Sequence, residues 1–106
     1  MSNITATVSI GQGAHKAQEP LDLAQWHEFR RLVGTLLSEV VDGTVHVNGA
    51  LGKGEWNGVP EVSATFVADV PQHRLHVVRA GLAFLAKAYG QECIALTLGH
   101  TEFVSP

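Results

Sequence analysis

The sequence predicts an α+β fold: a ferredoxin-like plait in which four strands form one antiparallel sheet and two helices lie on one face of it. Three observations predict this fold. Four segments alternate apolar and polar residues, as half-buried strands do, and two segments repeat apolar residues every three or four positions, as helices do. Their order is β-α-β-β-α-β, and 106 residues suffice for one such domain, residues 1–106.

The first half of the pattern contains one strand and one helix. Residues 4–10 alternate strictly, which predicts a half-buried strand that ends at Gly11-Gln12-Gly13. Asp22 and Gln25 have the spacing of a capping box, so we expect a helix to begin there and to run to about Val41. The apolar stripe of this helix is Trp26, Phe29, Val33, Leu36, Leu37 and Val40.

A strand, a glycine-rich loop and another strand are predicted next. Residues 44–51 alternate again, and residues 61–69 do the same. Between these strands the sequence predicts a loop, because glycines crowd the segment and Pro60 ends it. The loop is expected to hold Gly49, Gly52, Gly54 and Gly58 around Lys53, Glu55 and Trp56.

The last third of the chain predicts a second helix and a final strand. Pro71 suits the first turn of a helix, and the apolar stripe that follows ends at Tyr89. Gly90 comes directly afterwards and predicts a left-handed C-cap. Residues 94–98 alternate in the final strand. The stripe of the second helix is Leu75, Val78, Leu82, Leu85 and Tyr89.

The composition excludes several classes of protein. Hydrophobic residues make up 45% of the chain and the net charge is −3, which excludes a disordered chain. The single cysteine, Cys93, excludes an intramolecular disulfide and fits a reducing compartment. The N-terminus lacks the pattern of a signal peptide, and no run approaches the roughly 18 apolar residues of a membrane span. We therefore expect a cytoplasmic protein with no membrane partner.

The sheet face that the helices leave open predicts how the protein meets its partners. An RNA-recognition plait displays aromatic side chains there, whereas small hydroxyl side chains are expected here, and ten acidic residues outnumber seven basic ones. We expect no nucleic-acid partner. The alternatives are a plain solvent-exposed face, a sheet-to-sheet homodimer interface and a shallow pocket centred on His46, and the expected partner is a second copy. The predicted open face is Thr5, Thr7, Ser9, Thr44, His46, Asn48, Ser63, Thr65, Val67, Ala95 and Thr97, and the covered face holds Ile4, Val8, Val45, Val62, Phe66, Ile94 and Leu96.

Histidine spacing offers candidate chemistry. His73 and His76 lie one helical turn apart, but no cysteine is nearby in sequence, so we expect a solvated helix turn and no metal or other cofactor. His100 and Glu102 share one side of an extended segment and are a candidate acid–base pair. With His46, this pair is the basis of an alternative hypothesis, a small dimeric plait enzyme.

Glycine-rich segments offer a second kind of site. Gly11-Gln12-Gly13 follows a strand and Gly52-Lys53-Gly54 lies in the predicted loop, but neither completes a phosphate-binding loop. Exposed backbone N–H groups beside Lys16 or Lys53 can still bind an anion. Trp56 is an aromatic residue in this loop, where it packs on the core or covers a ligand or partner.

Four short motifs together resemble a known family. They are Trp26-x-x-Phe29, Gly43-Thr44-Val45, Gly54-x-Trp56-x-Gly58-x-x-Glu61 and Tyr89-x-Gln91-x-Cys93-Ile94. This set is similar to a domain-of-unknown-function family of small bacterial plait proteins, and the segment Tyr-Gly-Gln-Glu-Cys-Ile-Ala-Leu-Thr resembles short proteins carried by phages. The resemblance implies no catalytic residues. A phage setting implies an accessory protein that blocks or diverts a host system.

The leading hypothesis is a non-enzymatic binding module, expected to be a homodimer, that binds or sequesters a small anionic, nucleotide-like ligand or a host protein. A structural or protein-interaction subunit is a third hypothesis. The candidate ligand-binding residues are Gly11, Gly13, His46, Lys53, Glu55 and Trp56.

Overall fold

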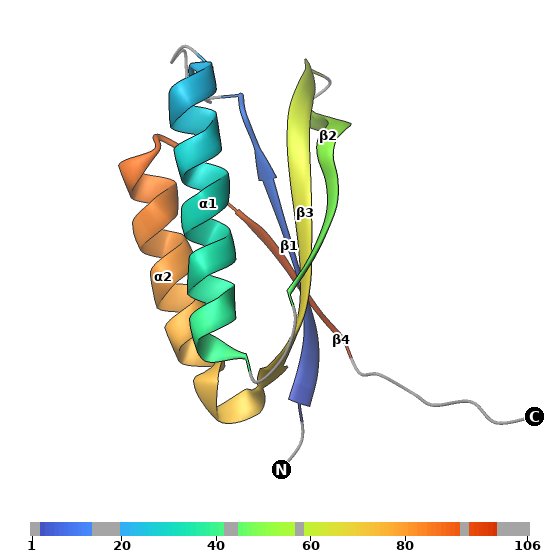
Figure 1. Cartoon of the computed structure of the whole chain (residues 1–106), viewed down its shortest axis with the longest axis vertical. Coiled ribbons are helices and arrows are strands. Elements are labelled where there is room, and N and C mark those ends of the chain that lie inside the picture. The colour runs from blue at the N-terminus through green and yellow to red at the C-terminus, as the bar shows by residue number, and fades with distance from the viewer. Residues whose placement is uncertain (1–2, 14–19, 42–44, 57–58, 92–93, 100–106) are drawn as a thin grey trace, which may run out of the picture.

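The chain folds into one layer of helices on one layer of sheet, as Figure 1 shows. The computed structural model describes residues 3–13, 20–41, 45–56, 59–91 and 94–99, with the backbone alone for 46–56 and 59–61. The elements are β1 (Asn3–Gly11), α1 (Leu23–Val40), β2 (His46–Trp56), β3 (Val59–Pro71), the 3₁₀ helix η1 (Gln72–Arg74), α2 (Leu75–Ala88) and β4 (Ala95–Gly99). The α+β class, with two helices on one face of an antiparallel sheet, is confirmed.

The strands lie in the order β2-β3-β1-β4, and each neighbouring pair is antiparallel. In the middle of the sheet, Val8 of β1 lies between Phe66 of β3 and Leu96 of β4. Because side chains alternate along a strand, this register turns the apolar residues of three strands toward the helices together. The buried residues of β1 and β3 are Ala6, Val8, Ile10, Ala64, Phe66, Ala68 and Val70.

Helix α1 begins where the capping box predicts. The Gln25 backbone N–H donates to Asp22 Oδ1 at 2.7 Å, and the Asp22 backbone N–H donates to Gln25 Oε1 at 3.0 Å. These two bonds satisfy donors that a helix start otherwise leaves unpaired. Five residues of the predicted stripe are buried against the sheet: Trp26, Phe29, Val33, Leu37 and Val40.

The end of α2 is also as predicted, but its beginning is not. Gly90 has φ 63°, and its N–H and that of Gln91 donate to the carbonyls of Lys87 and Ala86, which together form a Schellman motif. Pro71, predicted in the first helical turn, is instead the last residue of β3, where it pairs with Asn3. The register with β1 extends β3 to Pro71, and η1 then makes the turn into α2.

The predicted glycine-rich loop is largely wrong, because most of it is strand. β2 continues to Trp56 and β3 starts at Val59, with a register irregularity between Asn48 and Gly52 that absorbs the extra residues. Backbone pairing between the two strands outweighs the weak strand preference of glycine. Pro60 is tolerated inside β3 because β1 has already ended at the level of Ser63, so no neighbour on that side needs its missing N–H.

Two helical glycines show how closely α1 packs, Gly34 against the sheet and Gly81 of α2 against Leu36 of α1. A methyl group at Gly34 would lie 3.7 Å from Phe66 Cε2, an ordinary contact, whereas one at Gly81 would lie 2.6 Å from Leu36 Cδ1. Alanine is better than glycine in a helix by about 1 kcal/mol. We therefore expect Gly34→Ala to raise the free energy of unfolding by roughly 0.5–1 kcal/mol, and Gly81→Ala to lower it by about 1 kcal/mol, because Leu36 must move.

Urea denaturation of both variants beside the unmodified chain checks this prediction. Both substitutions gain the same helix propensity. The difference between their changes in the free energy of unfolding therefore measures the contact between α1 and α2 at Gly81. Equal stabilisation by both variants would contradict the close approach of the helices at that point.

Candidate binding groove

The register brings the two predicted glycine segments to the same end of the sheet. Gly11, the last residue of β1, pairs with Ser63 of β3, and Gly52 of β2 pairs with the same Ser63 from the other side. Gly11 is buried and Gly13, two residues further on, is half-buried. The two segments are thus separated by the width of a single strand, β3.

Gln12 ties this end of the sheet to the start of α1. Its backbone N–H donates to the Val62 carbonyl at 2.8 Å, and its carbonyl accepts from the Leu21 N–H at 2.9 Å. Its side-chain Nε2 donates to the Leu21 carbonyl at 3.0 Å. Gln12 and Leu21, which flank residues 13–20 in the chain, are therefore held side by side.

The other predicted site residues all lie on β2. Lys53, Glu55 and Trp56 pair with Val62, Pro60 and Val59 beyond the Ser63 level, and their side chains lie outside what the structure describes. His46 pairs with Val67. That is four residues along β3 from Ser63, or about 13 Å at 3.3 Å per residue, so the sheet does not bring His46 to the glycine segments. The candidate pair His100 and Glu102 lies outside the described residues.

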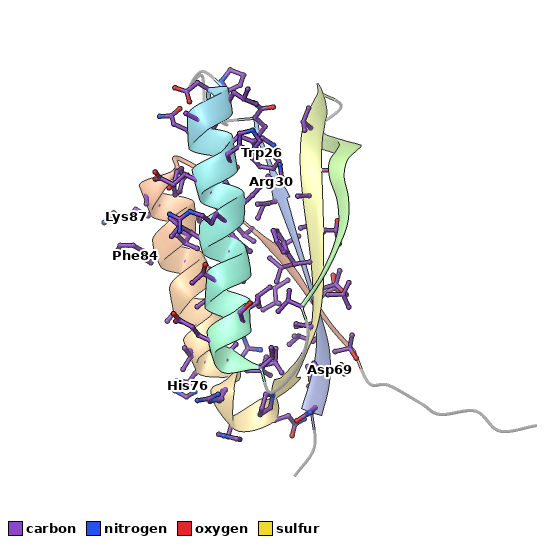
Figure 2. All side chains as sticks on the ribbon, viewed as in Figure 1. Trp26, Arg30, Asp69, His76, Phe84 and Lys87 are labelled. Carbon is purple, nitrogen blue, oxygen red and sulfur yellow. The ribbon has the colours of Figure 1, made fainter. Side chains whose placement is uncertain are left out.

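Two donors of α1 are buried near the same end of the sheet. The Arg30 guanidinium carbon lies 5.7 Å from the centroid of the Trp26 ring, a cation–π distance. Figure 2 shows both residues in the first turns of α1, on the side toward the sheet. Trp26 Nε1 and Arg30 Nε are buried and find no acceptor among the residues that the structure describes.

A separate hollow lies between α2 and β4. It has a volume of about 540 Å³ and is lined by α2, by the residues after it and by the helix-facing side of β4. Leu82 is buried at its floor, and Leu96 is half-buried opposite. We call it the α2–β4 groove, and its lining residues are Arg79, Leu82, Ala83, Ala86, Lys87, Gln91, Ile94 and Leu96.

The groove combines an apolar floor with positive charge. Arg79 and Lys87 are exposed on its lining and stand eight residues apart on one helix, about 12 Å along its axis. No Asp or Glu occurs from Gln72 to Gln91, although the whole chain has a net charge of −3. Gln91 is the one buried polar residue among those described, and its Nε2 donates to the Tyr89 carbonyl at 3.3 Å. The arrangement suits a ligand with an apolar body and an anionic group.

The prediction of site residues from sequence did not include this groove. The sequence pattern places Leu82, Ile94 and Leu96 among the core positions and gives no separate role to Arg79 or Lys87. One signal was available: a helix whose charged residues are all basic, in a chain with more acidic than basic residues.

A second hollow, of about 780 Å³, lies between the start of α1 and the end of α2. Tyr89 lies there, stacked on Phe29 with ring centroids 4.8 Å apart, and its hydroxyl donates to Glu28 Oε1. Partial burial, followed by the hydrogen bond to Glu28 and its negative charge, raises the pKa of Tyr89 to about 12. Phe84, 72% exposed, stands at the edge of this hollow, and Figure 2 shows it pointing away from the sheet.

Other classes of site are not found in the described part of the chain. No group of three or more His, Cys, Asp or Glu side chains there could hold a metal ion. None of the helices described is both long and apolar enough to cross a membrane. No protein-family model and no curated protein matches the sequence.

The Tyr89 hydroxyl gives a direct test of the α1–α2 contact, because Tyr89 is the one tyrosine of the chain. Absorbance at 295 nm should titrate near pH 12, against about 10 for a solvated tyrosine. Glu28→Gln should lower this midpoint while leaving it above 10, because burial still disfavours the phenolate.

The same shift sets a pH dependence of stability. Since the folded pKa lies above the unfolded one, the protonated phenol stabilises the fold below about pH 10, and this contribution is lost as the pH rises toward 12. Tyr89→Phe should abolish this part of the dependence. A titration midpoint of 10 in the unmodified protein, with the fold intact by circular dichroism, would refute the Glu28 contact.

Proposed function

We propose that this chain is a ferredoxin-like plait that works as a non-enzymatic binding module, and that its ligand occupies the α2–β4 groove. The element order β-α-β-β-α-β and the strand order β2-β3-β1-β4 support the fold assignment. The observation that carries the function is an apolar groove flanked by two cations, Arg79 and Lys87, in a chain that is otherwise acidic.

The chemistry of the lining defines the class of ligand. A volume of about 540 Å³ lies within the roughly 300–1,000 Å³ of small-molecule sites. Leu82 and Leu96 offer apolar surface for a flat ring or a short chain, and Arg79 can form paired hydrogen bonds with a phosphate or carboxylate. A nucleotide-like molecule, with a planar base and a phosphate, has both features.

The lining supports binding rather than catalysis. General acid–base catalysis needs a titratable group within hydrogen-bond reach of the substrate. The described lining holds two cations and Gln91 but no histidine or carboxylate. His46 belongs to β2, at the opposite edge of the sheet from β4. Of the predicted set, Gly11 and Gly13 are not among the described lining residues, and Lys53, Glu55 and Trp56 belong to β2, at the other edge of the sheet.

The test uses 1-anilinonaphthalene-8-sulfonate, a fluorescent probe with an apolar ring system and one negative charge. We expect the probe to bind the folded protein. The double variant with Arg79→Gln and Lys87→Gln should raise the Kd of the probe about five- to tenfold, which is the loss expected for two exposed charge contacts. Arg31→Gln is the matched control, since Arg31 is an exposed cation on α1 outside the groove.

A second pair of variants tests the apolar floor separately from the charge. Ala83→Trp places bulk in the groove and should abolish probe binding, whereas Ala80→Trp adds the same bulk to an exposed position of α2 that does not line it. Native mass spectrometry of the purified protein then identifies any bound natural ligand by its mass. Probe binding that is unchanged in both groove variants would exclude the α2–β4 groove as the site.

A further inference from the structure

Among the side chains that the structure describes, the sheet face turned away from the helices carries almost no charge. Of its residues with described side chains, Asp69 is the one that is charged. Solvated faces of antiparallel sheets ordinarily carry polar and charged side chains, and loss of charged residues is a property of the cores of protein interfaces. We call this surface the open face, and its described residues include Asn3, Thr5, Thr7, Ser9, Ser63, Thr65, Val67, Asp69, Ala95 and Thr97.

The register arranges these small side chains in rows across the sheet. Thr97, Thr7 and Val67 form one row on β4, β1 and β3. Two cross-strand contacts run along the open face: Thr5 Oγ1 donates to Asp69 Oδ1 at 3.0 Å, and the hydroxyls of Ser9 and Thr65 lie 3.5 Å apart. Because no long side chain rises from these rows, a partner surface can approach the described part of β1, β3 and β4 closely.

We propose that the open face is the interface of a homodimer, in which the open face of a second copy packs against it across a twofold axis. Hydroxyl groups both donate and accept hydrogen bonds, so a surface built from them is complementary to itself. Asp69 is the one charge on the described part of this surface, so two copies of net charge −3 meet there with few opposed like charges.

The size of the face fits a modest dimer. The strands β1, β2, β3 and β4 have 9, 11, 13 and 5 residues. At about 4.8 Å between strands and about 3.3 Å per residue, they cover roughly 600 Å² on each copy. Stable interfaces bury about 800 Å² per partner, and the lower limit for a specific one is about 500 Å². The contact therefore falls in the range of a specific but reversible dimer. It is independent of ligand binding in the α2–β4 groove, which lies on the helix side of the sheet.

The first test is sedimentation velocity from 10 to 500 µM. We expect the unmodified protein to dimerise in this range and Thr7→Lys to weaken the dimer at least a hundredfold, because two lysines then meet at the centre of the interface. Ala80→Lys, at an exposed position of α2, is the matched control and should leave the dimer unchanged. If Thr7→Lys fails to fold by circular dichroism, Thr97→Lys on the exposed side of β4 replaces it.

A distance measurement separates this arrangement from pairing through the free edge of β4. Nitroxide labels at Ala80→Cys in a Cys93→Ser background should lie about 40 Å apart in a face-to-face dimer, because two sheets and two helix layers separate them. Edge pairing would leave both α2 helices on one side of a joined sheet, with labels about 20 Å apart. A monomer at 500 µM, a dimer that survives Thr7→Lys and Thr97→Lys, or the shorter distance would each overturn the proposal.

Discussion

The antiparallel register between β1 and β3 is the constraint on which the rest of the structure depends. It sets Val8 opposite Phe66 and Ala6 opposite Ala68, so that the apolar residues of both strands point to one side. A slip of one residue would turn them to solvent and bury the threonines and serines of the other face. The small residues of this inner face also matter, because they leave room for Phe66 and for the closely packed helices above.

The groove and the open face follow from that register on its two sides. On the helix side, β4 continues the apolar face with Ile94, Leu96 and Leu98, which stay half-buried at the edge of the sheet. The hollow between α2 and this edge becomes the α2–β4 groove. On the other side, the same alternation collects Thr, Ser, Ala, Val and Asp69 on one face of the sheet. One protein thus presents an apolar groove with two cations on one side of the sheet and, on the other side, a face whose described residues include a single charge.

Short-range sequence signals correctly predict where α1 begins and where α2 ends. The capping box at Asp22 and the left-handed glycine at Gly90 are both confirmed, because each depends on hydrogen bonds within a few residues of the chain. The loop around Gly52 and Gly54 is wrong for the opposite reason. Glycine favours a loop when only its own residues are considered, but pairing with β3 is a contact between strands that the local composition does not show.

The sequence by itself determined the class of fold and which residues face the core, because alternation and helical spacing are periodic properties that survive without tertiary contacts. Only the tertiary structure decided the site. It brought Gly11 and Gly52 to the two sides of Ser63, kept His46 about 13 Å along β3 from them, and placed Arg79 and Lys87 beside Leu96 of a strand that follows later in the chain. Those distances depend on strand order and on the packing of α2 over β4, and both are set by long-range contacts rather than by any one segment.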